Sequence, residues 1–522
     1  MLTSRSAYPV LFVLALLVLA PMIGLLGVTG LASGDTDLGS LWHSQYIRRV
    51  LFFSLWQASL STLLSIGIAL PVARAFAHRG EFPMRALLLK LFALPLVVPA
   101  VVVVMGVVSV YGSNGWIPLG LSLYGLTGIL IAHVFFNLPL AVRLLLPVWQ
   151  TIPEHHWQLT SQLGLNQWQQ WKYLEWPALR ETLPGVGLLV FMLCLTSFAV
   201  VLTLGGGPRS TTLEVAIYQS LRFDFEPLQA VLLALLQLSL CIVVALISSR
   251  FHNLPDVEIT LSVAPKLKNN KSLFDNSLII GIATLFVALP LLAMFIDAVK
   301  GPLVQVLTIT ELWRSAAYTL MIGIFAASLS VVAGWGLLNT STDLAIRHEN
   351  TRAGFIELAG SIVYVVPPLV IGTGLFVLMM PWLDVFEWVF PIVILINAMM
   401  GLPFVIRTLG PAMRQSKMRY NRLCASLALS GWNRFKLVDW PLLRRPLGLS
   451  AALVAALAMG DLGVIALFGS PHTTTLPLLL YQQLAAYRMP QAAVTAAFLL
   501  LFCLLVFWML ENLIGGKPRV KR

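Results

Sequence analysis

Four polar side chains stand within long apolar stretches of this 522-residue sequence, where they could bind a cargo or relay protons. Asp461 is the only carboxylate deep in such a stretch, and it suits a cation because a charge in hydrocarbon is costly without a partner. A packing or gating role is the alternative. Ser197 occupies the matching position in the internal repeat described below. His133 and Asn397, which match each other, fit hydrogen bonds between helices better than a translocation pathway.

Constellations that carry out covalent chemistry are missing from the sequence. It has no paired carboxylates, no nucleophile beside a base and no metal-ligand spacing, which disfavours a membrane enzyme. It also lacks the glycine-rich loop, followed by Lys and Ser or Thr, that cradles phosphates. ATP hydrolysis would therefore have to come from another chain. We expect no catalytic residue, no metal ion and no cofactor.

The composition is that of an integral membrane protein, with 58% hydrophobic and only 11% charged residues. Apolar runs of about 18 residues or more recur, each long enough to cross roughly 30 Å of hydrocarbon as a helix. We predict an all-α protein in the lipid bilayer with about twelve transmembrane helices. These lie near residues 9–29, 50–73, 91–110, 125–142, 184–204, 228–249, 276–298, 316–338, 355–380, 388–406, 447–468 and 491–513.

The net charge of +12 reflects membrane orientation rather than nucleic-acid binding. If the N-terminus is cytoplasmic, all but seven of the 34 Lys and Arg residues fall in cytoplasmic segments, as the positive-inside rule requires. Both termini are then cytoplasmic. The first apolar run, of about 20 residues, is longer than that of a signal peptide, so a retained span is favoured over a cleaved leader.

The sequence contains one unit twice. "SQLGLNQWQQWKYLEWPALR" (161–180) aligns without a gap with "ASLALSGWNRFKLVDWPLLR" (425–444), at an offset of 264. Each copy has six predicted spans, and an even number makes the copies parallel, related by a pseudo-two-fold axis along the membrane normal. The predicted organisation is a first unit at 1–250 with a loop at 154–180, a cytoplasmic linker at 251–275, and a second unit at 276–522 with a loop at 418–444.

The first loop, at 154–180, is predicted to form two short helices. Residues 154–163 make the first, and Gly164 can end it in a left-handed conformation. Asn166 is a plausible N-cap for the second, at 167–174. Pro177 follows, where the chain turns toward the fifth span.

The aromatic residues of the two loops have the same spacing. Trp168 and Trp171 share one face of the predicted second helix, and Trp432 and Phe435 do so in the other copy, where Ser430 is the expected N-cap. We expect these aromatic faces to dock on the spans. Ordinary interfacial helices are the alternative interpretation, but two copies at matched positions favour a pair of docking surfaces for a two-fold partner.

The loops resemble the "EAA" loops of the inner-membrane permeases of binding-protein-dependent ABC importers. The positions that match that pattern are Gln158, Leu163, Gly164 and Pro177 in the first copy and Arg422, Leu427, Ala428 and Pro441 in the second. Both copies lack the acidic residue of the pattern, and Ala428 replaces its glycine. The resemblance implies that each loop couples to one of two cytoplasmic ATPase subunits, and that a periplasmic substrate-binding protein delivers the cargo to this bacterial inner membrane protein.

The cargo is suggested by a closer resemblance. The stretch "LGGGPRSTTLEVAIYQSL" and the single-chain fusion are similar to the permeases of thiamine ABC importers of Gram-negative bacteria, which implies thiamine, with its phosphates as further candidates, as the cargo. Ferric-iron importers are the alternative, and an ion-coupled secondary transporter is a more distant one because its repeats are often inverted. Thiamine is a cation with two aromatic rings, so carboxylates or aromatic faces could bind it.

The segments between the fifth and sixth spans of each copy are predicted to face the outside. They cover 205–226 and 469–490, and Pro208 matches Pro471 as Tyr218 matches Tyr481. We expect them to gate the pathway and to receive the binding protein.

Overall fold

The computed structural model describes residues 6–32, 44–80, 82–118, 122–248, 250, 273–361, 365–470 and 473–516. Nearly all of the predicted linker at 251–275, and Pro471, lie outside these ranges. Within them the chain forms helices and no β-strand.

In the described ranges, the first repeat, which ends at residue 248, contains thirteen α-helical or π-helical segments and two short 3-10 helices. In order they are α1 (Ala7–Ala32), α3 (Gln45–Arg79), α4 (Arg85–Leu91), α5 (Ala100–Tyr111), α6 (Leu126–Leu145), α7 (Val148–Thr151), α8 (Glu154–Gln162), α9 (Gln167–Gln170), η2 (Trp171–Glu175), α10 (Trp176–Leu195), α11 (Phe198–Leu204), α12 (Leu213–Arg222) and α13 (Pro227–Ser248).

The second repeat begins at α14 and follows the same order. Its elements are α14 (Leu273–Lys300), α15 (Leu303–Thr308), α16 (Thr310–Ile346), α17 (Asn350–Gly360), α18 (Pro368–Met379), α19 (Val389–Ser426), α20 (Gly431–Arg434), η6 (Phe435–Asp439), α21 (Trp440–Met459), α22 (Gly463–Phe468), α23 (Leu476–Ala485) and α24 (Met489–Gly515).

Ten helical segments of the described chain are long and apolar enough to cross a membrane, and they correspond to ten of the twelve predicted spans. The other two, the third and the ninth, occupy equivalent places in the repeat. The third is bent by 112° between α4 and α5, where Pro95 and Pro99 interrupt the helix. In the ninth, α18 starts at Pro368 and has 12 residues, or about 18 Å at 1.5 Å per residue.

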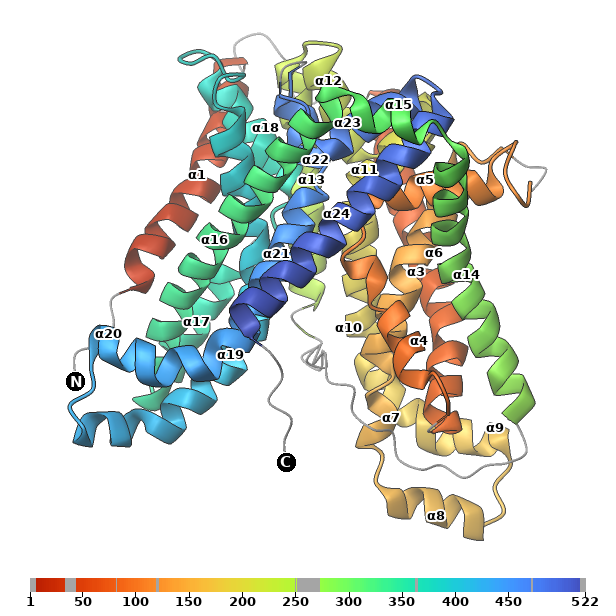
Figure 1. Cartoon of the computed structure of the whole chain (residues 1–522), viewed down its shortest axis with the longest axis vertical. Coiled ribbons are helices and arrows are strands. Elements are labelled where there is room, and N and C mark those ends of the chain that lie inside the picture. The colour runs from red at the N-terminus through yellow and green to blue at the C-terminus, as the bar shows by residue number, and fades with distance from the viewer. Residues whose placement is uncertain are drawn as a thin grey trace.

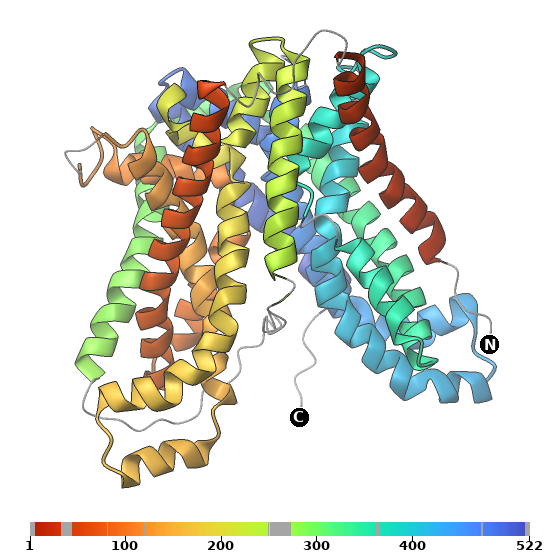
Figure 2. The same ribbon diagram turned by 180° about the vertical axis from the view of Figure 1, so that it is seen from behind.

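The repeats are parallel in space. In Figure 1 the loop elements α8, α9 and α20 lie at the bottom of the molecule, whereas α12 and α23 lie together at the top. The view from behind shows the same arrangement (Figure 2). Matched elements therefore lie at the same end, as the even number of predicted spans requires.

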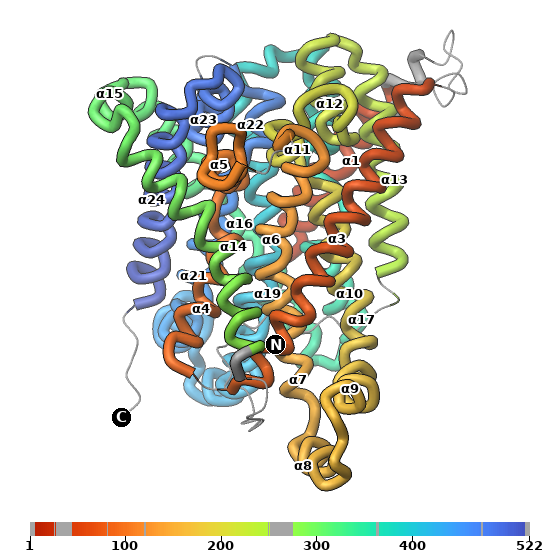
Figure 3. Tube along the Cα trace, turned by 90° about the vertical axis from the view of Figure 1, so that its right-hand side faces the viewer, coloured from red at the N-terminus to blue at the C-terminus, as the bar shows by residue number. Residues whose placement is uncertain are grey.

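The first helix of each repeat packs on the other repeat. α1 packs on α18 and α16, and α14 packs on α5 and α3 (Figures 1 and 3). The crossings are close: a Cβ on Gly374 would lie 2.5 Å from Pro21 Cβ, and one on Gly106 would lie 2.6 Å from the Pro290 carbonyl oxygen. The sequence units 1–250 and 276–522 are thus interlocked in space, because each lends its first helix to the other.

The apolar core has two parts. The larger contains buried residues of α5, α11 and α12 together with those of α18, α22 and α23, and so joins the two repeats near the top. The smaller lies mainly between α3, α6, α7 and α10 of the first repeat, where Phe76 and Trp149 are almost completely buried, and it also contains Ile280 and Ala283 of α14. The lower part of the first repeat therefore has its own core, on which the first loop rests.

Candidate coupling loops and pathway residues

Both loops end their first helix with the same backbone turn. The Leu165 amide donates to the Thr160 carbonyl at 3.0 Å, and Gly164 has φ +64°. In the second copy the Leu429 amide donates to the Cys424 carbonyl at 2.8 Å, and Ala428 has φ +52°. The predicted left-handed end at Gly164 is confirmed. Ala428 adopts the same conformation although its Cβ makes it less favourable by about 1 kcal/mol.

The caps of the second helices differ between the copies. Asn166 forms a reciprocal capping box with Gln169, with hydrogen bonds of 2.8 and 2.9 Å, which confirms the predicted N-cap. Ser430 occupies the N-cap position of α20 but makes no side-chain hydrogen bond there. The second loop therefore lacks a contribution of roughly 1 kcal/mol that the first one has.

A π-helix precedes the proline of each loop. The Trp176 amide donates to the Trp171 carbonyl in η2, and the Trp440 amide donates to Phe435 in η6. Pro177 and Pro441 then follow within the first turn of α10 and α21. A proline ring would clash with the carbonyl four residues earlier in a regular helix, and the wider π turn relieves that clash. The predicted change of direction thus occurs without interrupting the helix.

We predicted that both aromatic residues of each loop dock on the spans. The prediction is confirmed for one residue of each loop and wrong for the other. Trp171 is partly buried against Trp176, and Phe435 packs edge-on against Trp335 at 5.5 Å. Trp168 and Trp432 instead expose 69% and 73% of their surface. Their side of α9 and α20 faces away from the bundle, so only the residues one turn later reach the spans.

Four pairs of exposed apolar residues recur on the two loops at the offset of 264. We define the loop surface of the first copy as Leu159, Leu163, Trp168 and Tyr173, and that of the second as Leu423, Leu427, Trp432 and Leu437; all eight are exposed. Gln158 and Arg422 are exposed beside them. Large exposed apolar groups that recur at matched positions mark interaction surfaces.

The first loop is held to the bundle by the buried carboxylate of Glu175. It accepts hydrogen bonds from Arg74 Nε at 2.8 Å and from Trp149 Nε1 at 2.9 Å, and His78 Nε2 lies 3.3 Å away. Its side chain has no exposed surface. Breaking such a buried pair on one side costs about 3–5 kcal/mol, so Glu175 firmly joins η2 to α3 and α7.

The second loop has a different ionic anchor. Lys417 Nζ in α19 donates to Asp343 Oδ1 at 2.7 Å and to the Asn339 carbonyl at 2.8 Å, both in α16. Asp439, which matches Glu175, lies 3.5 Å from Arg434 instead. Neither anchor was predicted from the sequence. The acidic residues Glu175 and Asp439 each stand directly before a Trp-Pro pair. This repeated pattern is the signal that could have revealed the anchor of the first loop.

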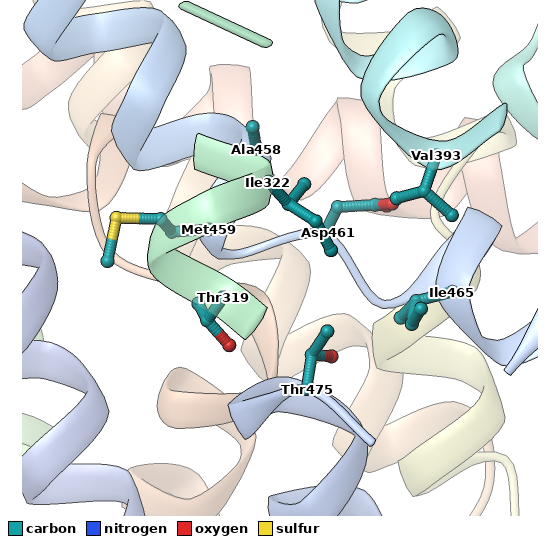
Figure 4. A pocket seen from close by; sticks show the side chains of 8 residues that line it. All are labelled: Thr319, Ile322, Val393, Ala458, Met459, Asp461, Ile465 and Thr475. Carbon is teal, nitrogen blue, oxygen red and sulfur yellow. The ribbon is translucent and has the colours of Figure 1, made fainter. Parts of the chain in front are cut away.

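The structure brings together two of the four predicted pathway residues. Asn397 Nδ2 donates to Asp461 Oδ2 at 3.2 Å, and the Gly463 amide donates to Asp461 Oδ1 at 3.0 Å, which caps the start of α22. Asp461 also lines a small pocket with Thr319, Thr475 and five apolar or sulfur-containing residues (Figure 4). In this conformation the pocket is closed too tightly to admit even a water-sized sphere.

The other two pathway residues belong to the first repeat and have other surroundings. His133 Nδ1 is 2.9 Å from the Ser61 hydroxyl, and among the described residues its Nε2 has no hydrogen-bond partner. Ser197 precedes α11 as Asp461 precedes α22, without a side-chain cap bond. The hydrogen bonds of His133 and Asn397 agree with the helix-to-helix role that the sequence favoured.

The segments 205–226 and 469–490 are fixed to the bundle by equivalent hydrogen bonds. The Leu213 amide donates to the Ser54 hydroxyl at 2.9 Å, and the Leu476 amide donates to the Thr319 hydroxyl at the same distance. One bond joins the two segments directly, from Arg222 Nη2 to the Gly469 carbonyl at 2.6 Å. The ends of the two repeats that lie opposite the loops are thus in contact in this conformation (Figure 1).

Parallel, interlocked repeats with one exposed loop surface each define a class of transport permease. Residues 344–516 match the family described as the binding-protein-dependent transport system inner membrane component. That match covers the second loop and the helices that carry it.

Relatives extend the comparison to the whole chain. It is 42% identical to the thiamine transport system permease protein ThiP of Brucella abortus (strain 2308), over 99% of this chain and 97% of the relative. The ThiP proteins of Escherichia coli (strain K12) and Haemophilus influenzae are 41% and 40% identical, over 92% and 91% of this chain and 92% and 90% of their own lengths. The chain therefore belongs to the family of binding-protein-dependent inner membrane permeases, which confirms the resemblance inferred from its loops.

Proposed function

We propose that this chain is the translocation subunit of a thiamine importer and that two cytoplasmic ATPase subunits drive it. The thiamine permeases to which it is similar along nearly its whole length carry the proposal for the cargo. This similarity favours thiamine over ferric iron. The alternative of an ion-coupled carrier has no comparable support, since the family works with binding proteins.

The duplicated loop surface supports the ATPase partners. Each copy presents a leucine pair, an exposed Trp and a further large side chain on the same inner end of the molecule. Two equivalent surfaces suit two equivalent subunits, one beneath each repeat. When ATP draws those subunits together, the loops follow, and the repeats rock about their contact at the outer end. ATP supplies the difference in free energy between the two states that alternating access needs.

The outer end is proposed to receive a periplasmic binding protein. With the loops on the cytoplasmic side and both termini inside, the segments 205–226 and 469–490 face outward. Two exposed aromatic residues there, Phe225 and Tyr487, adopt left-handed conformations with φ +54° and +56°. Aromatic residues are unfavourable in this region, which suggests that their exposure serves contact with that partner.

The cargo is tested with the purified permease, its ATPase and a candidate binding protein in vesicles. Thiamine is supplied on one binding protein and ferric iron on another. We expect ATP-dependent uptake of thiamine. Uptake of iron alone would contradict the proposed cargo, and uptake of thiamine without any ATPase would contradict the class of transporter.

The ATPase surface is tested by the paired variants Trp168→Ala and Trp432→Ala. We expect each to reduce the ATPase retained on the solubilised permease by about tenfold, the equivalent of 1.4 kcal/mol. The double variant should retain none. Trp116→Ala, an exposed Trp outside the loops, is the control. Full retention in the double variant would show that these surfaces do not bind the ATPase.

A further inference from the structure

A second buried carboxylate lies near Asp461, outside the long apolar runs. Glu214, in the short outer helix α12, is 2% exposed. Among the described residues it has no ion-pair partner, and its Oε1 atom has no hydrogen-bond partner. Burying an uncompensated carboxylate is costly, so its presence calls for either a proton or a bound cation.

Glu214 and Asp461 come from different repeats and meet at the contact between them. α12 packs against α22, the helix that Asp461 caps. Each carboxylate lies at the start of its helix: Glu214 is in the first turn of α12, and Asp461 accepts a hydrogen bond from the amide of Gly463, the first residue of α22. Asn397 and Gly463 donate hydrogen bonds to Asp461, whereas Glu214 Oε1 has no partner among the described residues, so a cation between the two carboxylates would be neutralised mainly by Glu214.

Aromatic rings border the same place. Phe198 packs edge-on against Tyr218 at 5.3 Å, and Tyr218 lies one helical turn after Glu214. A Cβ built on Gly463 would lie 3.6 Å from both Phe198 Cδ1 and Asp461 Oδ1, so the ring and the carboxylate flank this glycine. Rings beside carboxylates can bind an organic cation through its charge and through its faces.

The side chain of Thr475 lines the pocket beside Asp461 and carries a hydroxyl group. Thr475 is 3% exposed and lines that pocket, and among the described residues its Oγ1 has no hydrogen-bond partner (Figure 4). A polar ligand in the pocket would satisfy it. The pocket is closed in this conformation, so a ligand could enter only when the outer helices separate.

We propose that Glu214 and Asp461, together with the rings of Phe198 and Tyr218, form a binding site for an organic cation that carries aromatic rings. The site lies where the two repeats meet, on the path that opens during alternating access. It rests on the proposed function, and thiamine has the chemistry that it would bind. Glu214 supplies the charge, and the rings select an aromatic cation over a metal ion.

The test uses the complete transporter in vesicles and compares Glu214→Gln with the wild type. Gln keeps the size of Glu but removes its charge. We expect thiamine uptake to fall about tenfold or more, while ATP hydrolysis stimulated by the loaded binding protein stays within about twofold. Glu214→Asp should recover part of the uptake. Glu311→Gln, at an exposed acidic residue in the first turn of α16, is the matched control because Glu214 is likewise in the first turn of its helix.

Three outcomes would overturn the site. Uptake by Glu214→Gln at the wild-type rate would show that the carboxylate is a neutral packing group. A parallel loss of uptake and ATP hydrolysis would indicate structural damage instead of lost cargo binding. Failure of the wild-type vesicles to take up thiamine would contradict the proposed cargo and this site with it, whereas the first two outcomes leave the cargo intact. Asp461→Asn should also slow uptake, but its cap on α22 makes it the less specific probe.

Discussion

The two repeats present equivalent loop surfaces but hold them in place by opposite arrangements of charge. In the first, the acid is on the loop at Glu175 and the bases are on α3 at Arg74 and His78. In the second, the base is Lys417 in α19 and the acid is Asp343 in α16. Arg74 and His78 match Asn339 and Asp343 at an offset of 265, so equivalent helix positions carry different charges.

The helix leading into each loop differs in the same way. Pro153 separates α7 from α8 in the first repeat, because a proline restricts the residue before it and Ile152 is extended with ψ 117°. Lys417 replaces Pro153 at the offset of 264, and α19 runs unbroken through 38 residues. Apolar periodicity and the left-handed turn therefore set the shape of the loop, whereas the polar anchor can be exchanged.

The largest difference is expected when Glu175 is replaced. Glu175→Ala leaves Arg74 and Trp149 without their buried acceptor, at a cost of about 3–5 kcal/mol, so the first loop should detach from α3. We expect faster hydrogen exchange at residues 171–175 and loss of uptake. Glu181→Ala, at an exposed acid six residues later, is the control. Unchanged exchange would mean that apolar packing alone holds the loop.

A smaller effect is expected from Lys417→Met. This change removes hydrogen bonds to Asp343 and Asn339, but Asp343 is 27% exposed and water can replace the ammonium group. The expected cost is about 1–3 kcal/mol, measured as a lower midpoint of thermal unfolding. Lys436→Met, at an exposed position, is the control. A destabilisation as large as that of Glu175→Ala would show that the two anchors contribute equally to stability.

Gly164→Val tests the turn that both loops share. A β-branched residue at φ +64° costs about 1–2 kcal/mol, and nothing within 4 Å of the built Cβ adds a clash. We expect normal insertion with a misplaced first loop surface and loss of ATP-driven uptake. Normal uptake in this variant would contradict the coupling role of the loop. Gly354→Val, at a glycine with similar open space in α17, is the control for side-chain size.

Periodicity and internal repetition were sufficient to predict ten of the spans, the parallel repeats and the two loops. They could not predict that α1 and α14 exchange partners, because an apolar helix such as α1 carries no signal for which repeat it packs on. The bend at Pro95 and Pro99 was hidden within an apolar run. Glu214 was missed because α12 is short and the burial of Glu214 depends on helices from both repeats.

The smallest effect, and the one of opposite sign, is expected for Ala428→Gly. Ala428 has φ +52°, a conformation that glycine adopts without a steric penalty from Cβ, so the substitution should stabilise the turn by up to about 1 kcal/mol. The greater conformational entropy of glycine in the unfolded chain reduces this gain. The reciprocal change Gly164→Ala should destabilise the first turn by a similar amount. Slower hydrogen exchange at Leu429, whose amide closes the turn, measures the gain. If both substitutions destabilise the protein, the residues around Ala428 favour alanine at this position. The two turns then have the same shape but different stabilities.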